Sequence, residues 1–319
     1  MFFDTFRAEV RRYADGVHEL GAPVEKRALA AAAERLGRKL PPALADFYQS
    51  WNGARLFADS FVIRPLEAIA VEDDALAVGE ALGAPIFVDD AGRVLEADDA
   101  GERVVAGATV ESWLAAVMAR EALLVDRQGE WKEVFAGEGE LEPAIARKRT
   151  RAALKADPDA AAWHLEAAEL AFDDGDDDAA RAALERAVAL DARAGAAWEL
   201  LGALSRRAGR LDEAERAYAA AAESARDDAR AAERWAEAAR AAHEAGRADA
   251  RASHAARAAA VENAAARAAA WLDEARRLAA DGDVEGALNR ATLAEALGET
   301  DEISRLVKQL RARKSLRVI

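Results

Sequence analysis

The second half of the chain carries apolar residues at the three- and four-residue spacing of amphipathic helices, interrupted by short polar turns. The pattern repeats, because each unit has a tryptophan in its first helical segment and a glycine in the turn that follows. The tryptophans are Trp163, Trp198, Trp235 and Trp271, and the glycines are Gly175, Gly209, Gly246 and Gly282. This regular spacing predicts a solenoid of four helical pairs over residues 159–299.

The clearest unit, AAWELLGALSRRAGRLDEAERAYAAA at residues 196–221, shows why two helices would pair there. Its small residues, Gly202, Ala214 and Ala221, permit a close helix approach, and Trp198 and Tyr218 fill the space beside them. These residues resemble the tetratricopeptide repeat. The resemblance implies an all-α solenoid with a concave groove, lined by the first helix of each pair, for binding protein or peptide.

Two more helices are expected at the ends of this array. Residues 142–158 predict a helix before the first pair, ending at Asp157-Pro158. At the other end, Thr300 is a candidate N-cap for a capping helix, followed by a basic tail, over residues 300–319. Its apolar stripe is Ile303, Leu306, Val307 and Leu310.

The first 126 residues show a different, mixed pattern that predicts an α+β domain, with helices packed on an antiparallel sheet. We expect helices in the N-terminal 22 residues and at 23–40, 43–51 and 108–125, and strands at 61–69, 84–90, 92–98 and 103–110. The turn Asp89-Asp90-Ala91-Gly92 joins two of these strands in a predicted hairpin.

The order of these features resembles the SUKH superfamily, which includes fungal cell-wall assembly regulators and bacterial immunity proteins. The resemblance is carried by Leu40, Pro41, Trp51, Asn52 and Gly53 and by the strands that follow. It implies a non-enzymatic binding module, often one that neutralises a toxin. The predicted domains are therefore 1–126 (SUKH-like), 127–158 (joint and leading helix), 159–299 (repeats) and 300–319 (cap and basic tail).

Charge and composition narrow the partners. The net charge of −15 disfavours nucleic acid and anionic membranes as partners. The chain has no cysteine, which excludes disulfides and thiolate catalysis, and no apolar run approaches the ~20 residues of a membrane-spanning helix. We expect a cytoplasmic bacterial protein. Its oligomeric state is left open.

The negative charge is concentrated in residues 72–142, which hold 18 acidic and 5 basic side chains. An acidic face there would steer a basic partner, such as a toxin, towards the first domain. The alternative is an ordinary solvated acidic surface. The candidate residues of this acidic face are Glu72, Asp73, Asp74, Asp89, Asp90, Asp98 and Asp99.

The second candidate surface is the concave groove of the repeats. Arginines on three successive units are placed to bind an acidic or carboxylate-bearing segment. The alternative is that they are solvated or paired with Glu199, Glu233 and Glu237. The candidate groove residues are Leu165, Glu169, Phe172, Glu199, Arg206, Arg207, Glu233, Arg240, His243 and Arg276, with Ala203, Ala236 and Leu272 between them.

Candidate catalytic and metal-binding groups are few. His243 and His254 lie on the two helices of the third unit, but we favour two solvated histidines over a metal site. The run at residues 173–178 fits a helix N-cap better than a calcium loop. For Trp51-Asn52-Gly53 we favour a core tryptophan and a turn over a ligand contact. We expect no enzyme activity and no cofactor.

These observations favour a non-catalytic protein-binding protein. The leading hypothesis is a toxin-neutralising immunity protein, whose acidic first domain binds a basic partner and whose solenoid binds a second protein. The alternative is a cytoplasmic scaffold or adaptor that recognises peptides through the repeat groove.

Overall fold

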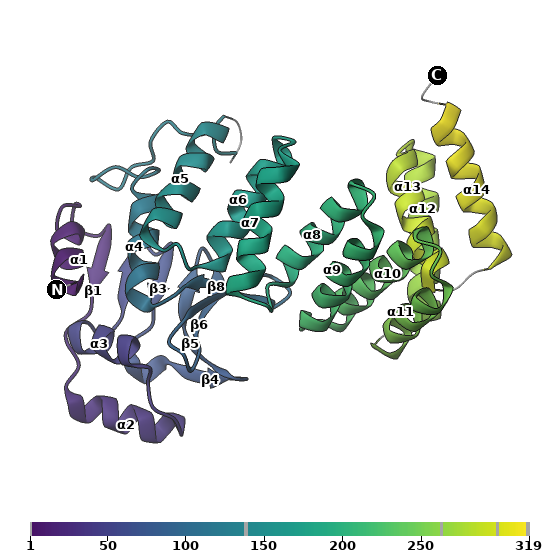
Figure 1. Ribbon diagram of the computed structural model, residues 1–319. Coiled ribbons are helices and arrows are strands. Elements are labelled where there is room, and N and C mark those ends of the chain that lie inside the picture. Colours follow the sequence, from purple (N-terminus) through teal and green to yellow (C-terminus); the bar gives the residue numbers. More distant parts are fainter. Residues whose placement is uncertain (1, 137–139, 262–263, 298–299, 317–319) are drawn as a thin grey trace. The chain divides into compact units, whose positions relative to one another are not determined.

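The computed structural model describes residues 2–136, 140–261, 264–297 and 300–316. The chain forms two compact units, Met1–Ala194 and Gly195–Ile319. The first unit contains an antiparallel sheet with helices, and the second is all-helical (Figure 1). An α+β part followed by an all-α part is the fold class that the sequence predicts.

The first unit is built on an antiparallel sheet in the order β1-β2-β3-β5-β6-β7-β8, with β4 paired to β5. The strands are β1 (His18–Leu20), β2 (Ala54–Leu56), β3 (Phe61–Ile63), β4 (Ala70–Glu72), β5 (Ala75–Ala81), β6 (Ala84–Val88), β7 (Val94–Ala97) and β8 (Arg103–Gly107). The predicted hairpin is confirmed, since the Asp89 N–H donates to the Arg93 carbonyl at 3.1 Å across the β6–β7 turn.

The helices of this unit follow the predicted order, but the helix expected in the first 22 residues ends at Val10. His18–Leu20 instead forms β1, after a turn in which Gly16 has φ 88°. The helices are α1 (Phe2–Val10), α2 (Lys26–Leu36), α3 (Pro42–Ser50), α4 (Val110–Glu121), α5 (Pro143–Ala156), α6 (Ala161–Asp173) and α7 (Asp177–Leu190), with a 3-10 turn at Leu66–Ala68. The helix expected over 23–40 is shorter because Gly37 adopts a left-handed conformation (φ 66°) and its N–H caps the last turn.

Alternate residues along β5 point to opposite faces of the sheet. Leu76 and Val78 join the main core with side chains of α1, α3 and α4, whereas Ala75 and Ala77 pack with Phe87 on the second face. Strand β5 is absent from the sequence-based prediction because ALAVGEA is rich in alanine and contains a glycine. Gly79 is required, since a Cβ there would lie 1.8 Å from the Val62 carbonyl oxygen.

Helices α5–α7 belong to the first unit because buried aspartates at their ends bond to the sheet domain. The Asp157 carboxylate, after α5, accepts from the Ala108 N–H at 2.9 Å and the Ser112 hydroxyl at 2.6 Å. The Asp191 carboxylate, after α7, accepts from the Val105 N–H at 3.1 Å. The boundaries predicted at 126/127 and 158/159 therefore lie inside one compact unit, and the first helical pair is part of it.

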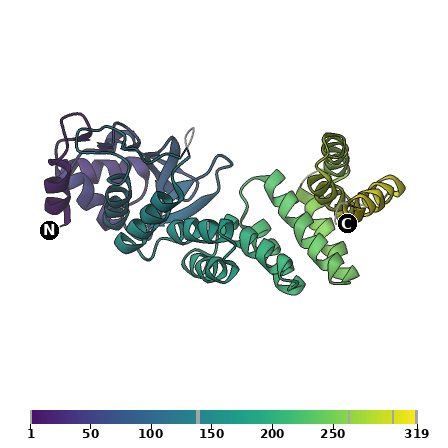
Figure 2. The same ribbon diagram turned by 90° about the horizontal axis from the view of Figure 1, so that it is seen from above.

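The second unit contains the remaining helices, which run as antiparallel pairs and end in α14 (Figures 1 and 2). They are α8 (Gly195–Arg207), α9 (Leu211–Ser224), α10 (Asp228–Glu244), α11 (Ala248–Val261), α12 (Ala264–Asp281), α13 (Val284–Leu297) and α14 (Asp301–Leu316). The α8–α9 pair is close, because a Cβ on Gly202 would lie 3.0 Å from the Tyr218 ring. The Thr300 hydroxyl caps α14, as predicted, by accepting from the Ile303 N–H at 3.2 Å.

The fourth pair departs from a regular stack. In a regular array its first helix, α12, would pack on α11, but α12 makes few contacts there. Instead the second helix of the pair, α13, packs against α10 and α11. None of the helices within the described residues is both long and apolar enough to cross a bilayer.

We predict that Asp157→Ala lowers the free energy of unfolding by about 1–2 kcal/mol, because it leaves two partly buried hydrogen-bond donors without their acceptor. Urea unfolding followed by tryptophan fluorescence measures this loss. Asp159→Ala is the matched control, since the Asp159 side chain is 59% exposed in its ion pair with Arg186. Equal losses in the two variants would contradict a role for Asp157 in docking α5 to the sheet domain.

Candidate functional site

The predicted groove residues fall in two separate units, so each set is considered alone. In the first unit, Leu165 and Phe172 of α6 are half-buried and Glu169 is exposed. Desolvation, together with the carboxylates of Glu166 and Asp173, raises the pKa of Glu169 above its usual range. This part of α6 presents an acidic and partly apolar surface.

In the second unit the first-helix positions of α8 remain on the surface. Glu199 and Arg207 are exposed, and Ala203 and Arg206 are half-buried. Arg206 lies 3.9 Å from the Glu244 carboxylate. The α8 face is therefore a mixed surface of both charges with a small residue, Ala203, between them.

Much of α10 is enclosed by other helices, including the predicted groove residues Ala236 and Arg240, whereas Glu233 is half-buried. Arg234, only 2% exposed, donates to the Glu199 carboxylate at 2.8 Å and to the Ala221 carbonyl at 3.1 Å. Arg240 is buried in an ion pair with Glu237. Burial raises the pKa of Glu237, although the arginines at 240 and 206 act in the opposite direction.

These ion pairs correct the arginine-groove hypothesis for two positions. Arg240 is buried in its pair with Glu237, and Arg276 pairs with Asp273 at 2.9 Å and also with Glu302. Both arginines are therefore occupied within the second unit, and the pairing of Arg240 with Glu237 is one that the paired alternative expects. The physical reason is that each arginine lies three residues after its acidic partner on the same helix, so the two side chains share one face.

Helix α13 covers the α10 face of the third pair. Arg290 of α13 bonds to Glu233 at 2.5 Å, and Arg240 donates to the Asn289 side-chain oxygen. Ala236, between these two positions on α10, is wholly buried in one apolar cluster with residues of α12–α14. His243 is exposed at the end of α10 and lines a small cavity with residues of α13 and α14. The third part of the predicted groove is thus already filled.

The acidic face of the first unit is largely paired. Arg103 lies 3.3 Å from Asp73 and 3.2 Å from Asp74, and Arg193 lies 3.3 Å from Asp74. The Arg103 side chain is 7% exposed, with its guanidinium 3.6 Å from the centroid of the Phe87 ring. It therefore lies across the second face of the sheet, held at the β4–β5 turn.

The aspartates at the β6–β7 and β7–β8 turns are also engaged within the first unit. Asp89 pairs with Arg93 at 2.8 Å, Asp90 pairs with Arg38, and Asp98 accepts from the Ala100 and Glu102 N–H groups at 2.9 Å each. The side chains at Glu72, Asp98 and Asp99 are exposed. The net charge of residues 72–142 overstates the acidity of this face, because the fold also brings Arg38 and Arg193 to it from outside that range.

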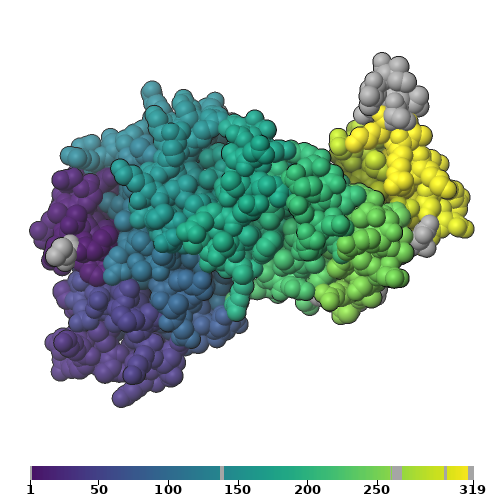
Figure 3. Space-filling model, in the orientation of Figure 1, coloured from purple at the N-terminus to yellow at the C-terminus, as the bar shows by residue number. Residues whose placement is uncertain are grey.

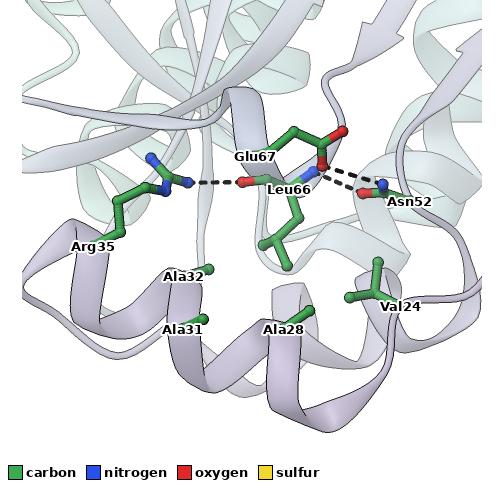
Figure 4. Close-up of a pocket in the computed structure, with 8 residues that line it drawn as sticks. All are labelled: Val24, Ala28, Ala31, Ala32, Arg35, Asn52, Leu66 and Glu67. Carbon is green, nitrogen blue, oxygen red and sulfur yellow. Dashed lines mark hydrogen bonds between the residues drawn. The ribbon is translucent and has the colours of Figure 1, made fainter.

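A cavity of about 270 Å³ lies between α2 and the loop that follows β3 (Figure 4). Its wall is apolar, and its rim carries three polar side chains. The lining residues are Val24, Ala28, Ala31, Ala32, Arg35, Asn52, Leu66 and Glu67. Sequence reasoning missed this cavity because α2 offers only a run of alanines, which signals helix and not a site.

The polar rim of this cavity holds the loop together. The Asn52 side-chain oxygen accepts from the Leu66 N–H at 2.7 Å, and its amide donates to Glu67 at 3.2 Å. Arg35 donates to the Leu66 carbonyl at 2.8 Å and the Ile69 carbonyl at 2.9 Å. Trp51 is buried, 3% exposed, and Gly53 has φ 89°. The prediction of a core tryptophan followed by a turn at Trp51-Asn52-Gly53 is confirmed.

No group of three or more potential metal ligands occurs among the residues that the structure describes. The Asp176 side chain caps α7 by accepting from the Ala179 N–H at 3.0 Å, as predicted for this acidic run. His254 is not a solvated histidine. It stacks on Trp235, with 5.4 Å between the ring centroids, and its Nε2 lies 2.9 Å from the buried Glu215 carboxylate.

Three comparisons with known proteins bear on the chain. No protein-family model and no curated protein matches it. Among solved structures, PilF of Pseudomonas aeruginosa is similar, with 18% identity over 54% of this chain and 78% of that one, and a TM-score of 0.36. MamA gives 16% identity over 54% and 92%, with a TM-score of 0.34.

A third similar structure is YrrB, a tetratricopeptide-repeat protein with an unusual peptide-binding site. Its identity is 18% over 52% of this chain and 81% of that chain, with a TM-score of 0.34. Each of these likenesses extends over about half of the present chain.

We predict that Asn52→Ala lowers the free energy of unfolding by about 1–2 kcal/mol, because the Leu66 N–H loses its acceptor. Chemical denaturation measures the change. The control is Gln49→Ala in the last turn of α3, three residues before Asn52, where the residue is exposed. A loss no larger than that of the control would show that Asn52 does not stabilise the loop.

His18 supplies a pH-dependent prediction. Burial lowers its pKa from 6.5 to about 4. The unfolded chain therefore binds more protons between these values, and stability falls as the pH decreases through this window. Linkage gives a loss of at most about 2 kcal/mol at pH 5 relative to neutral pH, and solvent screening of the partly exposed ring reduces it. In His18→Phe this part of the loss should vanish, as measured by unfolding at pH 7.5 and pH 5. An unchanged pH response would exclude His18 as its source.

Proposed function

We propose that this chain is a non-catalytic protein-binding protein, an adaptor whose helical pairs recognise a segment of another protein. The observation that carries the proposal is that one first-helix face, that of α10, already binds a helix, α13. The contacts are of the kind that protein interfaces use, with small apolar residues in the centre and charged pairs beside them.

The neighbouring α8 face supports the same role. Ala203 offers a small, half-buried position between the charged side chains of Glu199 and Arg207. A partner segment would place an apolar side chain over Ala203 and charged groups on either side. The buried Arg240 is paired with Glu237, and an ion pair of this kind suits a scaffold better than acid–base chemistry.

The test of this proposal is affinity capture with the full chain as bait and quantitative mass spectrometry as readout. Ala203→Trp should lower the recovery of the true partner by about tenfold, because a bulky side chain blocks the centre of the surface. Arg216→Glu is the control, since Arg216 is exposed on the second helix, α9.

Two results would contradict the adaptor role. One is equal recovery of every captured protein by wild type, Ala203→Trp and the control. The other is turnover of a substrate by the purified chain.

Toxin neutralisation by a SUKH-like first domain is a narrower second candidate. It is supported by the exposed carboxylates of Glu72, Asp98 and Asp99 at turns and a strand edge of the sheet. Its partner would be a basic protein bound mainly by charge, and released by salt. The double variant Glu72→Lys/Asp99→Lys should then lose that partner while Ala203→Trp retains it.

A further inference from the structure

The face of α10 that α13 covers has the composition of a binding site for a helix. At its centre Ala236 is wholly buried against the α12–α14 cluster. On the side of α13 that carries Asn289 and Arg290 the buried apolar residue is Leu293, which is 1% exposed and shares a cluster with Ala236. A small residue on α10 therefore leaves room for a larger apolar side chain from α13.

Charged side chains specify how α13 is seated on this face. Arg290 bridges Glu233 of α10, at 2.5 Å, and Glu274 of α12, at 3.3 Å. The preceding residue, Asn289, accepts a hydrogen bond from Arg240 of α10. An adjacent Asn–Arg pair on the helix thus meets an Arg and a Glu that lie seven residues apart on α10.

The end of α13 is held by the same helical pair. Arg251 of α11 donates to the Glu295 carbonyl at 2.6 Å, within the last turn of α13. A cation at this position satisfies a carbonyl that lacks an intrahelical partner and offsets the helix dipole. The third pair therefore contacts α13 at its middle and at its C-terminal end.

Helices α12–α14 also have a core of their own. Trp271, Leu272, Leu293 and Val307 are buried together in one cluster, to which α10 contributes only Ala236. In the space-filling view α14, in yellow, forms the outer surface of this block (Figure 3). The block can therefore leave α10 and keep most of its apolar contacts.

We propose that the α10 face is a helix-binding site with α13 as its resident ligand, and that a partner protein exchanges its own helix for α13. The partner helix would carry an adjacent Asn–Arg pair, which Glu233 and Arg240 select, and an apolar residue in the place of Leu293 beside Ala236. This inference rests on the proposed adaptor function. A tethered ligand is present at millimolar effective concentration, so the site opens to a partner only when α13 is weakened or outcompeted.

The experiment uses the full chain and a fluorescent peptide of residues 283–297, DVEGALNRATLAEAL, which contains α13 and its N-cap Asp283. Fluorescence anisotropy measures binding. We expect the peptide to bind Arg290→Glu at least tenfold more tightly than wild type, because that variant weakens the internal competitor. The same peptide carrying the R290E change should not bind either chain.

Two matched variants separate this effect from general loosening. Arg276→Glu makes the same charge change on α12, where Arg276 pairs only within the block with Asp273 and Glu302. It should bind the peptide as weakly as wild type. The double variant Glu233→Arg/Arg290→Glu restores opposite charges across α10 and α13, and should return binding to the wild-type level.

Hydrogen exchange provides a readout that does not depend on the peptide. Arg290→Glu should speed exchange of α10 and α13 amides, while circular dichroism confirms that helix content is retained. If Arg290→Glu unfolds, Arg290→Gln is the milder substitute. Equal peptide affinity in wild type, Arg290→Glu and Arg290→Gln would overturn the inference, as would tight binding to Arg276→Glu. Partner capture through Ala203 tests the adaptor role separately, since the peptide assay needs no partner.

Discussion

Close approach of helices over alanine is the constraint on which the second unit depends. Alanine buries little apolar area, so a core made of it gains less hydrophobic stabilisation than one made of leucine or phenylalanine. It also leaves short distances that long polar side chains can bridge. Pairs with one buried partner, such as Arg234 with Glu199 and Glu215 with Arg247, follow from this geometry. Removing the exposed partner of such a pair leaves the buried charge unpaired.

The same constraint governs what α13 does. Helix α13 packs beside the small residue Ala236 of α10, with Leu293 in the same apolar cluster. The ionic contacts of Arg290 then select one arrangement among several of similar packing. A solenoid built in this way can bind its own last pair on the surface that other pairs would use for a partner. The proposed exchange follows because small apolar residues can accept more than one helix, whereas the ionic contacts select which helix is bound.

In the first unit the comparable constraint is the satisfaction of backbone groups at element ends. Asp191, after α7, accepts from the Val105 N–H in the middle of β8. Asp157, after α5, accepts from the Ala108 N–H just beyond the end of β8. They attach the first helical pair to the sheet domain beside the shared apolar core, to which Ala153, Ala160 and Trp163 belong. Charged side chains also complete the small core on the second face of the sheet. Arg103 lies over the Phe87 ring and pairs with Asp73, so both charged groups are less available to a partner.

The sequence predicts the helical pairs, their turns and the α+β order of the first half, because these depend on local spacing, glycines, prolines and caps. It also predicts Thr300 and the aspartates at 173–178 as capping groups. It does not predict β5, because the need for Gly79 arises from the Val62 carbonyl oxygen on a neighbouring strand, 1.8 Å from where a Cβ would lie. The packing of α13, and not α12, on α10 and the pairing of Arg38 and Arg193 with distant aspartates depend on the tertiary structure. Such pairings join residues far apart in the chain, and their energies depend on distances that no local pattern encodes.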